Sequence, residues 1–410
     1  MDIRTRLVGP CATRTQDLET VVVDLGALVR RIILFDHYIF QSIRLEEFPI
    51  LVRAFGYAGV KALLDSGILS VQSDILTLAQ IGQSNIGLRD RKGLLPLGSY
   101  SFVVLTVADR EQYIHEAFGE VEGIEGLTGR QRIRLKGKIA NRLIERPANA
   151  GKLALAQTEL DLEHNVSNIK LATARTLASK LRAQIDPNDF SLKVHRIDET
   201  DFRVESNVAE RFGLSEQETH KQIELALLAV GRVNQRIEDM KQYTALSGAR
   251  DDDLPVLEEK FGFLERQLSA ESQETTLHRV ITIAGLPELP EDDSDQGVNL
   301  ARLVDISRTP ECQQFRQWLR SIEDASDDDI RDQFHPIRER ISAVMRGRPG
   351  KAVRLLATSA AGLVPEAGLI LAPALDVLDT FVVDELISKP GPLTFLSRMY
   401  PSIFEPASTD

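Results

Sequence analysis

The chain has 410 residues, of which 43% are hydrophobic and 27% charged, a composition typical of a globular protein with two or three domains. Its 49 basic and 61 acidic residues give a net charge of −12, which argues against a general nucleic-acid binder because phosphate contacts dominate that affinity. Aromatic residues make up only 6% of the chain, so side chains that could stack on bases are scarce.

Cysteine usage and the first residues indicate the compartment. Cys11 and Cys312 lie far apart in the sequence, so they form neither a disulfide framework nor a metal-binding spacing. This pattern favours a reducing environment. The opening sequence MDIRTRLVGPCATRTQ also lacks the apolar core of a signal peptide. We therefore expect a cytoplasmic protein, with a composition that fits a bacterial-type cytoplasm.

Strand and helix patterns alternate in the N-terminal part. Val29–Phe40 is rich in Ile, Phe and Tyr and predicts a strand or a buried segment. A helix is predicted over 45–64 with Gly67 as its C-cap, followed by a short strand over 68–71. The run SFVVLTV at 101–107 has the strongest buried-strand pattern. This alternation predicts a small α/β portion over residues 1–125.

Asp36 and His37 form a charged pair inside an apolar run. Burying a charge is costly unless it is paired, so such a pair is either a satisfied core pair or part of a functional site. The sequence leaves both interpretations open.

Helical patterning dominates from residue 126 to residue 284. This region opens with the only dense basic run of the chain: Arg130, Arg132, Arg134, Lys136, Lys138 and Arg142. The register spreads these charges over several helix faces, which favours a solvated helix over an anion-binding patch made by Arg130, Arg132, Arg134, Lys136 and Lys138. A hairpin is predicted near 190–206, and Ser215 with Glu218 forms a capping box for a long helix.

The C-terminal part begins after an acidic, proline-containing linker over 285–297. A helical domain over 298–410 follows, with one helix starting at Thr309-Pro310-Glu311. The apolar tail at 393–404 is expected to dock back onto the body. The sequence thus predicts a predominantly helical α+β fold, with a small N-terminal α/β portion followed by helical domains.

The longest apolar stretch, Leu355–Leu375, carries one charged residue, Glu366. Its length is sufficient to span a membrane, but Pro365 and Pro373 would interrupt a single helix. We therefore expect an apolar helix pair over 352–387, either packed in the protein core or acting on a membrane. Its candidate interaction or membrane-facing residues are Leu363, Leu369, Leu371 and Leu375.

No motif identifies a catalytic centre. The seven histidines are scattered without a metal-ligand spacing, and no phosphate loop or nucleophile elbow is present, so no metal or cofactor is expected. The leading hypothesis is a non-enzymatic interaction or assembly protein that binds another protein rather than nucleic acid. The alternatives are a membrane-acting effector using the apolar helix pair 352–387, and a hydrolase or nuclease with a site assembled from distant residues.

Overall fold

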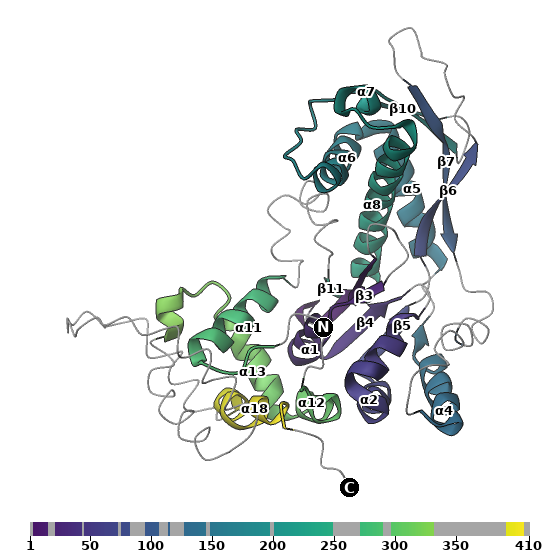
Figure 1. Cartoon of the computed structure of the whole chain (residues 1–410). Helices are drawn as coiled ribbons and strands as arrows, with labels where there is room; N and C mark the ends of the chain where they lie inside the picture. The colour runs from purple at the N-terminus through teal and green to yellow at the C-terminus, as the bar shows by residue number, and fades with distance from the viewer. Residues whose placement is uncertain are drawn as a thin grey trace, which may run out of the picture.

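The computed structural model describes most of the chain as a predominantly helical α+β fold (Figure 1). The described residues are 3–14, 21–42, 45–72, 75–82, 95–105, 114, 127–144, 148–196, 201–248, 271–289, 297–331 and 391–405.

A five-stranded parallel sheet with the order β11-β1-β4-β5-β8 lies in the lower part of the molecule (Figure 1). Its strands are β1 (Arg6–Gly9), β4 (His37–Gln41), β5 (Leu69–Gln72), β8 (Leu143–Ile144) and β11 (Leu246–Ser247). Parallel neighbours require crossover connections. The helices α1 (Leu25–Leu34) and α2 (Glu47–Ser66) supply the first two, and a small hairpin of β2 (Ala12–Arg14) and β3 (Val21–Val23) precedes α1.

The segment predicted as one strand or buried run, Val29–Phe40, is divided in the structure. Its first half belongs to helix α1, which Asp24 caps by accepting a hydrogen bond from the Ala27 amide at 2.6 Å, and its second half is strand β4. Nearly all residues of α1 are buried, and its apolar residues Leu25, Leu28, Val29, Ile32 and Ile33 keep helical spacing. A segment that begins at Val29 contains only the second half of this pattern and runs directly into strand β4.

Helix α2 and strand β5 confirm the predicted helix, cap and short strand. Gly67 adopts a left-handed conformation at φ 79° and ends the helix, as expected for a C-cap glycine. Gly56 interrupts α2 at φ 70°, which the sequence pattern did not indicate. The positive φ at Gly56 divides α2 into two helical parts joined by a kink.

A second unit combines an antiparallel sheet with three long helices. The sheet has the order β6-β7-β10-β9, and its last two strands are the predicted hairpin near 190–206. Its strands are β6 (Ile75–Gly82), β7 (Leu95–Leu105), β9 (Leu192–Arg196) and β10 (Asp201–Ser206). Its helices are α5 (Ala148–His164), α6 (Val166–Leu181) and α8 (Glu216–Tyr243), with the short helix α7 (Val208–Phe212) beside them.

Helix α8 links the two units. It begins at the predicted capping box, in which the Glu218 amide donates to Ser215 Oγ at 3.2 Å. Its first turns pack on α6, and its C-terminal part contacts β1 before the chain continues into β11. Figure 1 shows α8 running from the upper unit down to the parallel sheet.

The C-terminal helices pack beside the parallel sheet. They are α11 (Glu271–Ala284), α12 (Leu300–Ser307), α13 (Pro310–Ser321), α17 (Gly391–Thr394), the π-helical turn η3 (Phe395–Met399) and α18 (Tyr400–Ser402). Phe395 stacks on Phe315 with ring centroids 4.3 Å apart, and Tyr400 donates a hydrogen bond to the Pro287 carbonyl at 2.6 Å. The prediction that the tail docks onto the body is confirmed.

The buried apolar residues form two main clusters. The larger cluster joins residues of the parallel sheet, α1 and α2 to residues of α11, α12, α13 and the tail. The smaller one lies among α5, α6, α8, β9 and β10. The first cluster therefore draws on both ends of the chain. The boundaries 1–125, 126–284, 285–297 and 298–410 stay predictions.

Candidate interaction surface

The basic run predicted from the sequence lies on helix α4 (Gly129–Ala140). Thr128 caps this helix in a capping box: the Gln131 amide donates to Thr128 Oγ1 at 3.3 Å, and the Thr128 amide donates to Gln131 Oε1 at 2.8 Å. Leu135 and Ile139, one turn apart, are completely buried on one side of α4, which packs against α2. Helix α4 therefore has a defined inner face.

Polar contacts fix the C-terminal end of α4 to the end of α2. Lys138 forms an ion pair with Asp65, which also pairs with Lys61 at 2.9 Å. Hydrogen bonds from Lys138 and Lys61 lower the pKa of the Asp65 carboxyl. Arg142 follows the helix and donates to the Leu64 carbonyl at 2.6 Å and the Asp65 carbonyl at 3.2 Å. These bonds satisfy carbonyls at the C-terminus of α2, where cations are favourable.

The outer face of α4 carries an apolar side chain between two arginines. Ile133 is 72% exposed, and Arg130 and Arg134 lie three residues before it and one after it. Both arginines are exposed, and neither has a hydrogen-bond or ion-pair partner in the part of the chain that the structure describes. A side chain at Gly137, one turn beyond Ile133, would meet nothing within 4 Å. We call Arg130, Ile133, Arg134 and Gly137 the outer face of α4.

The five residues of the predicted anion patch therefore separate into two groups. Arg130 and Arg134 belong to the outer face, whereas Lys138 pairs with Asp65. Arg132 and Lys136 are half-buried and have interaction partners. The exposed basic charge of this helix is concentrated in two arginines.

Asp36 and His37 contact different partners. The Asp36 side chain is 48% exposed and forms an ion pair with Arg316 of α13. His37 Nε2 lies 2.9 Å from Ser70 Oγ on the neighbouring strand β5. Burial, with smaller contributions from the positive charges of Arg6 and Arg142, lowers the pKa of His37. The structure describes two separate contacts here rather than one pair.

Arg316 holds α13 against the end of α1. Its Nε donates to the Ile33 carbonyl at 2.6 Å and its Nη2 donates to the Ile32 carbonyl at 2.9 Å, while Nη1 contacts Asp36. The Arg316 side chain is 4% exposed. Arg316 thus satisfies carbonyls at the C-terminus of α1 that the helix itself cannot satisfy.

A polar cluster at the carboxyl end of the parallel sheet has no counterpart in the sequence analysis. Gln41 at the end of β4 donates to Gln72 Oε1 at 3.0 Å and to Asp239 Oδ2 at 2.7 Å, and Gln72 lies at the end of β5. Asp239 is completely buried and belongs to α8. The one available signal was that two apolar strands each end in glutamine. This edge of an open parallel sheet is where such folds commonly bind ligands, but here the bonds from Gln41 and Gln72 to Asp239 join the sheet to α8.

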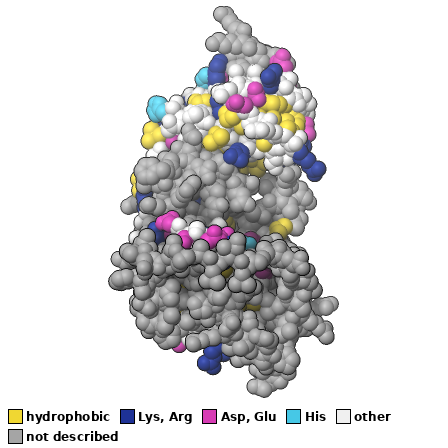
Figure 2. All heavy atoms as spheres, turned by 90° about the vertical axis from the view of Figure 1, so that its left-hand side faces the viewer, with side chains coloured by type: hydrophobic (Ala, Val, Ile, Leu, Met, Phe, Trp, Pro, Cys, Tyr) yellow, Lys and Arg dark blue, Asp and Glu magenta, His cyan; other side chains and the backbone are white. Residues whose placement is uncertain are grey.

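Charged and apolar side chains are interspersed elsewhere. Figure 2 shows basic, acidic and apolar side chains mixed over the described surface of the upper unit. Within the described residues, no three His, Cys, Asp or Glu side chains are grouped so that they could hold a metal ion. Among the same residues, no helix is both long and apolar enough to cross a membrane.

The predicted apolar helix pair 352–387 lies outside the described residues. This includes its candidate interaction residues Leu363, Leu369, Leu371 and Leu375.

Comparison of the chain with known proteins gives no relative. No family model, no curated protein and no solved structure matches it. The functional proposal therefore depends on the geometry of the chain itself.

Proposed function

We propose that this chain is a non-enzymatic interaction protein that binds an acidic segment of a partner protein on the outer face of α4. The observation that carries the proposal is the exposure of Ile133 between two arginines that pair with no residue of the described ranges, on a helix fixed to the body by its inner face. The free thiols of Cys11 and Cys312, both buried, support a reducing cytoplasm as its location.

The physical chemistry of this face favours a partner with both acidic and apolar side chains. Burying an isoleucine side chain stabilises a complex by about 1.5–3 kcal/mol. Two arginines can form bidentate hydrogen bonds with carboxylates, which also orient the partner. Little ordering of α4 is required on binding, because its inner face is already packed.

The test uses a fluorescent helical peptide built from Glu and Leu, titrated with the full-length protein. We expect binding that weakens at high salt and that falls at least about tenfold in Ile133→Ser and in Arg130→Glu, since a tenfold change corresponds to about 1.4 kcal/mol. Lys152→Glu is the matched control: it changes the charge equally, at an exposed lysine of α5.

Two results would contradict the proposal. Equal peptide binding by Arg130→Glu and Lys152→Glu would show that only overall charge matters. Binding of the wild type to vesicles of anionic phospholipid, lost in Ile133→Ser and without any binding of the peptide, would assign the outer face to a membrane surface instead.

A further inference from the structure

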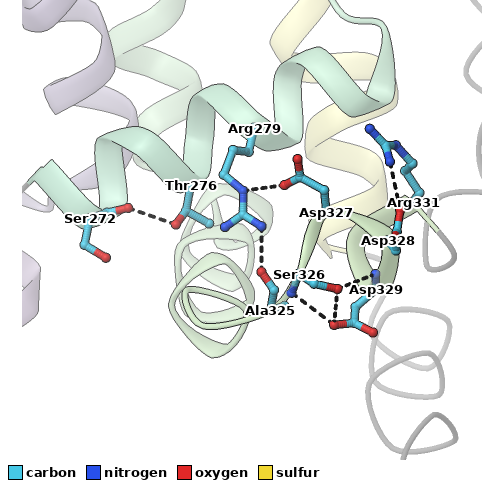
Figure 3. Close-up of polar contacts among 9 residues, drawn as sticks. All are labelled: Ser272, Thr276, Arg279, Ala325, Ser326, Asp327, Asp328, Asp329 and Arg331. Atoms are coloured by element: carbon cyan, nitrogen blue, oxygen red, sulfur yellow. Dashed lines mark hydrogen bonds and ion pairs between the residues drawn. The ribbon is translucent and has the colours of Figure 1, made fainter.

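The turn after α13 carries the densest described group of exposed carboxylates. Asp324, Asp327, Asp328 and Asp329 are all exposed within six residues. The Asp329 amide donates to Ser326 Oγ at 3.2 Å and the Ser326 amide donates to Asp329 Oδ2 at 3.0 Å (Figure 3). The Ser326 hydroxyl also donates to Asp329 Oδ2 at 2.6 Å, and this bond, together with the one from the Ser326 amide, lowers the pKa of the Asp329 carboxyl. We call residues 324–329 the acidic turn.

The acidic turn is held in a fixed position. Arg279 of α11 donates through Nε to Asp327 at 2.7 Å and through Nη2 to the Ala325 carbonyl at 2.6 Å, as Figure 3 shows. Asp328 forms an exposed contact of 2.8 Å with Arg331, and its side chain is 86% exposed. Such a contact is worth little because water and salt screen it. The turn is therefore ordered by Ser326 and Arg279, and not by Asp324 or Asp328.

Among the described residues, only some of the carboxylates of this turn pair with a cation. Arg279 and Arg331 together balance two of its four carboxylates. Asp324 has no hydrogen-bond or ion-pair partner among the residues that the structure describes. Two carboxylates of the turn, Asp324 and Asp329, thus pair with no cation of the described ranges, and the turn opposes the two arginines of the outer face of α4 in sign.

The two surfaces cannot meet within one chain. Figure 1 shows α4 at the right-hand edge of the molecule, whereas α13 lies toward the left, on the far side of α1, α12 and α2. The acidic turn follows α13 directly and is fixed to α11 by Arg279. A contact between the two surfaces must therefore join two copies of the protein.

We infer that the acidic turn of one copy binds the outer face of α4 on the next copy, so that the protein assembles head to tail. This inference rests on the proposed function, for which it names the partner as a second copy of the chain. Because the two surfaces differ and lie on opposite sides, the contact is heterologous, and its repetition produces a ring or an open filament.

The contact is small and depends on charge. A stable protein interface buries roughly 1,600 Å² in total, more than one helix face and one turn provide. Assembly is therefore weak and visible at high protein concentration and low salt. It disappears when the Debye length falls from about 30 Å at 0.01 M salt to about 3 Å at 1 M salt.

The test is a charge exchange followed by sedimentation velocity. One variant reverses the basic side (Arg130→Glu with Arg134→Glu) and another reverses the acidic side (Asp324→Lys with Asp328→Lys). Neither changes Asp327 or Asp329, which order the turn. We expect the wild type to form species larger than one chain at low salt, and each variant alone to sediment as a single chain. An equimolar mixture of the two variants regains the larger species, because each reversed surface meets its complement.

The controls separate this inference from the proposed function. Lys152→Glu with Lys221→Glu, at two exposed lysines of the other unit, should leave the assembly unchanged. The inference is wrong if the wild type stays a single chain at low salt, or if the mixture of variants does not associate. Binding of the acidic helical peptide under those conditions would leave the proposed function standing, whereas failure of both measurements would overturn both.

Discussion

Replacing Arg316 with methionine tests how the C-terminal helices are attached to the parallel sheet. The substitution keeps a long unbranched side chain but removes the donors to the Ile32 and Ile33 carbonyls and the contact with Asp36. The guanidinium is buried, so these carbonyls lose partners that water replaces poorly. Hydrogen bonds to a charged group contribute about 1.5–3 kcal/mol each, so we expect the free energy of unfolding to fall by about 3–5 kcal/mol.

Asp36→Asn provides the matched comparison for this measurement. It removes the charge of a carboxylate that is 48% exposed and leaves both carbonyl contacts intact, so we expect a loss of at most about 1 kcal/mol. Urea unfolding followed by circular dichroism compares the two variants, with the midpoint and the slope fitted separately. An Arg316→Met loss no larger than that of Asp36→Asn would refute the account, because the carbonyl contacts would then contribute nothing.

Three further predictions concern other sites. The pKa of His37 is lower in the folded protein than the unfolded value of about 6.5, so the neutral imidazole stabilises the fold above pH 6.5. This stabilisation is lost as the pH falls through the folded pKa. His37→Gln should therefore flatten the decline in melting temperature that the wild type shows below about pH 6.5. Gly9→Ala should destabilise the protein by about 1–3 kcal/mol in urea, because the added Cβ would lie 2.4 Å from the Gly248 carbonyl oxygen, whereas Gly137→Ala, which meets nothing, should stabilise α4 by up to about 1 kcal/mol. Leu371→Asp should lower the melting temperature and expose the segment to protease if the predicted pair 352–387 packs in the core; loss of liposome binding with an unchanged fold would instead support the membrane alternative.

Features that depend on a few neighbouring residues were predicted correctly. The capping box at Ser215 and Glu218, the start of α13 at Thr309 and Pro310, and the left-handed Gly67 all act within about one helical turn. The hairpin of β9 and β10 has the same local character. For such elements, the chemistry that forms the structure is visible within a short window of sequence.

Helix α1 and the break between α5 and α6 show where local patterns fail. The helical spacing of α1 runs from Leu25 to Ile33, so a segment that begins at Val29 shows only half of it, joined to the apolar strand β4. The residues from Leu153 to Leu181 continue in one helical pattern, yet the chain turns at Asn165, whose side chain donates to Asp161 Oδ1 at 3.0 Å. Asparagine competes for backbone and side-chain partners in this way, and its effect depends on the surrounding packing.

The candidate surface was predictable as a basic helix but not as a docking face. Which cations remain exposed depends on Asp65, which lies 73 residues before Lys138 and takes that lysine out of the patch. In the same way, Asp36 finds a partner 280 residues away in Arg316. Neighbouring residues in the sequence can have different partners, because the fold decides which distant side chain reaches each of them.

Buried polar contacts along α8 join the upper unit to the parallel sheet. Asn234 donates to Asp161 at 2.8 Å in the upper unit, and Asp239 accepts from Gln41 at 2.7 Å in the parallel sheet. Buried networks of this kind are costly to disrupt, so they resist movement of α8 against either core. A rigid body with complementary surfaces on opposite sides loses little conformational freedom when it binds. Weak contacts can then act together in a closed ring, because the contact that closes the ring joins two surfaces already held in one assembly at a high effective concentration.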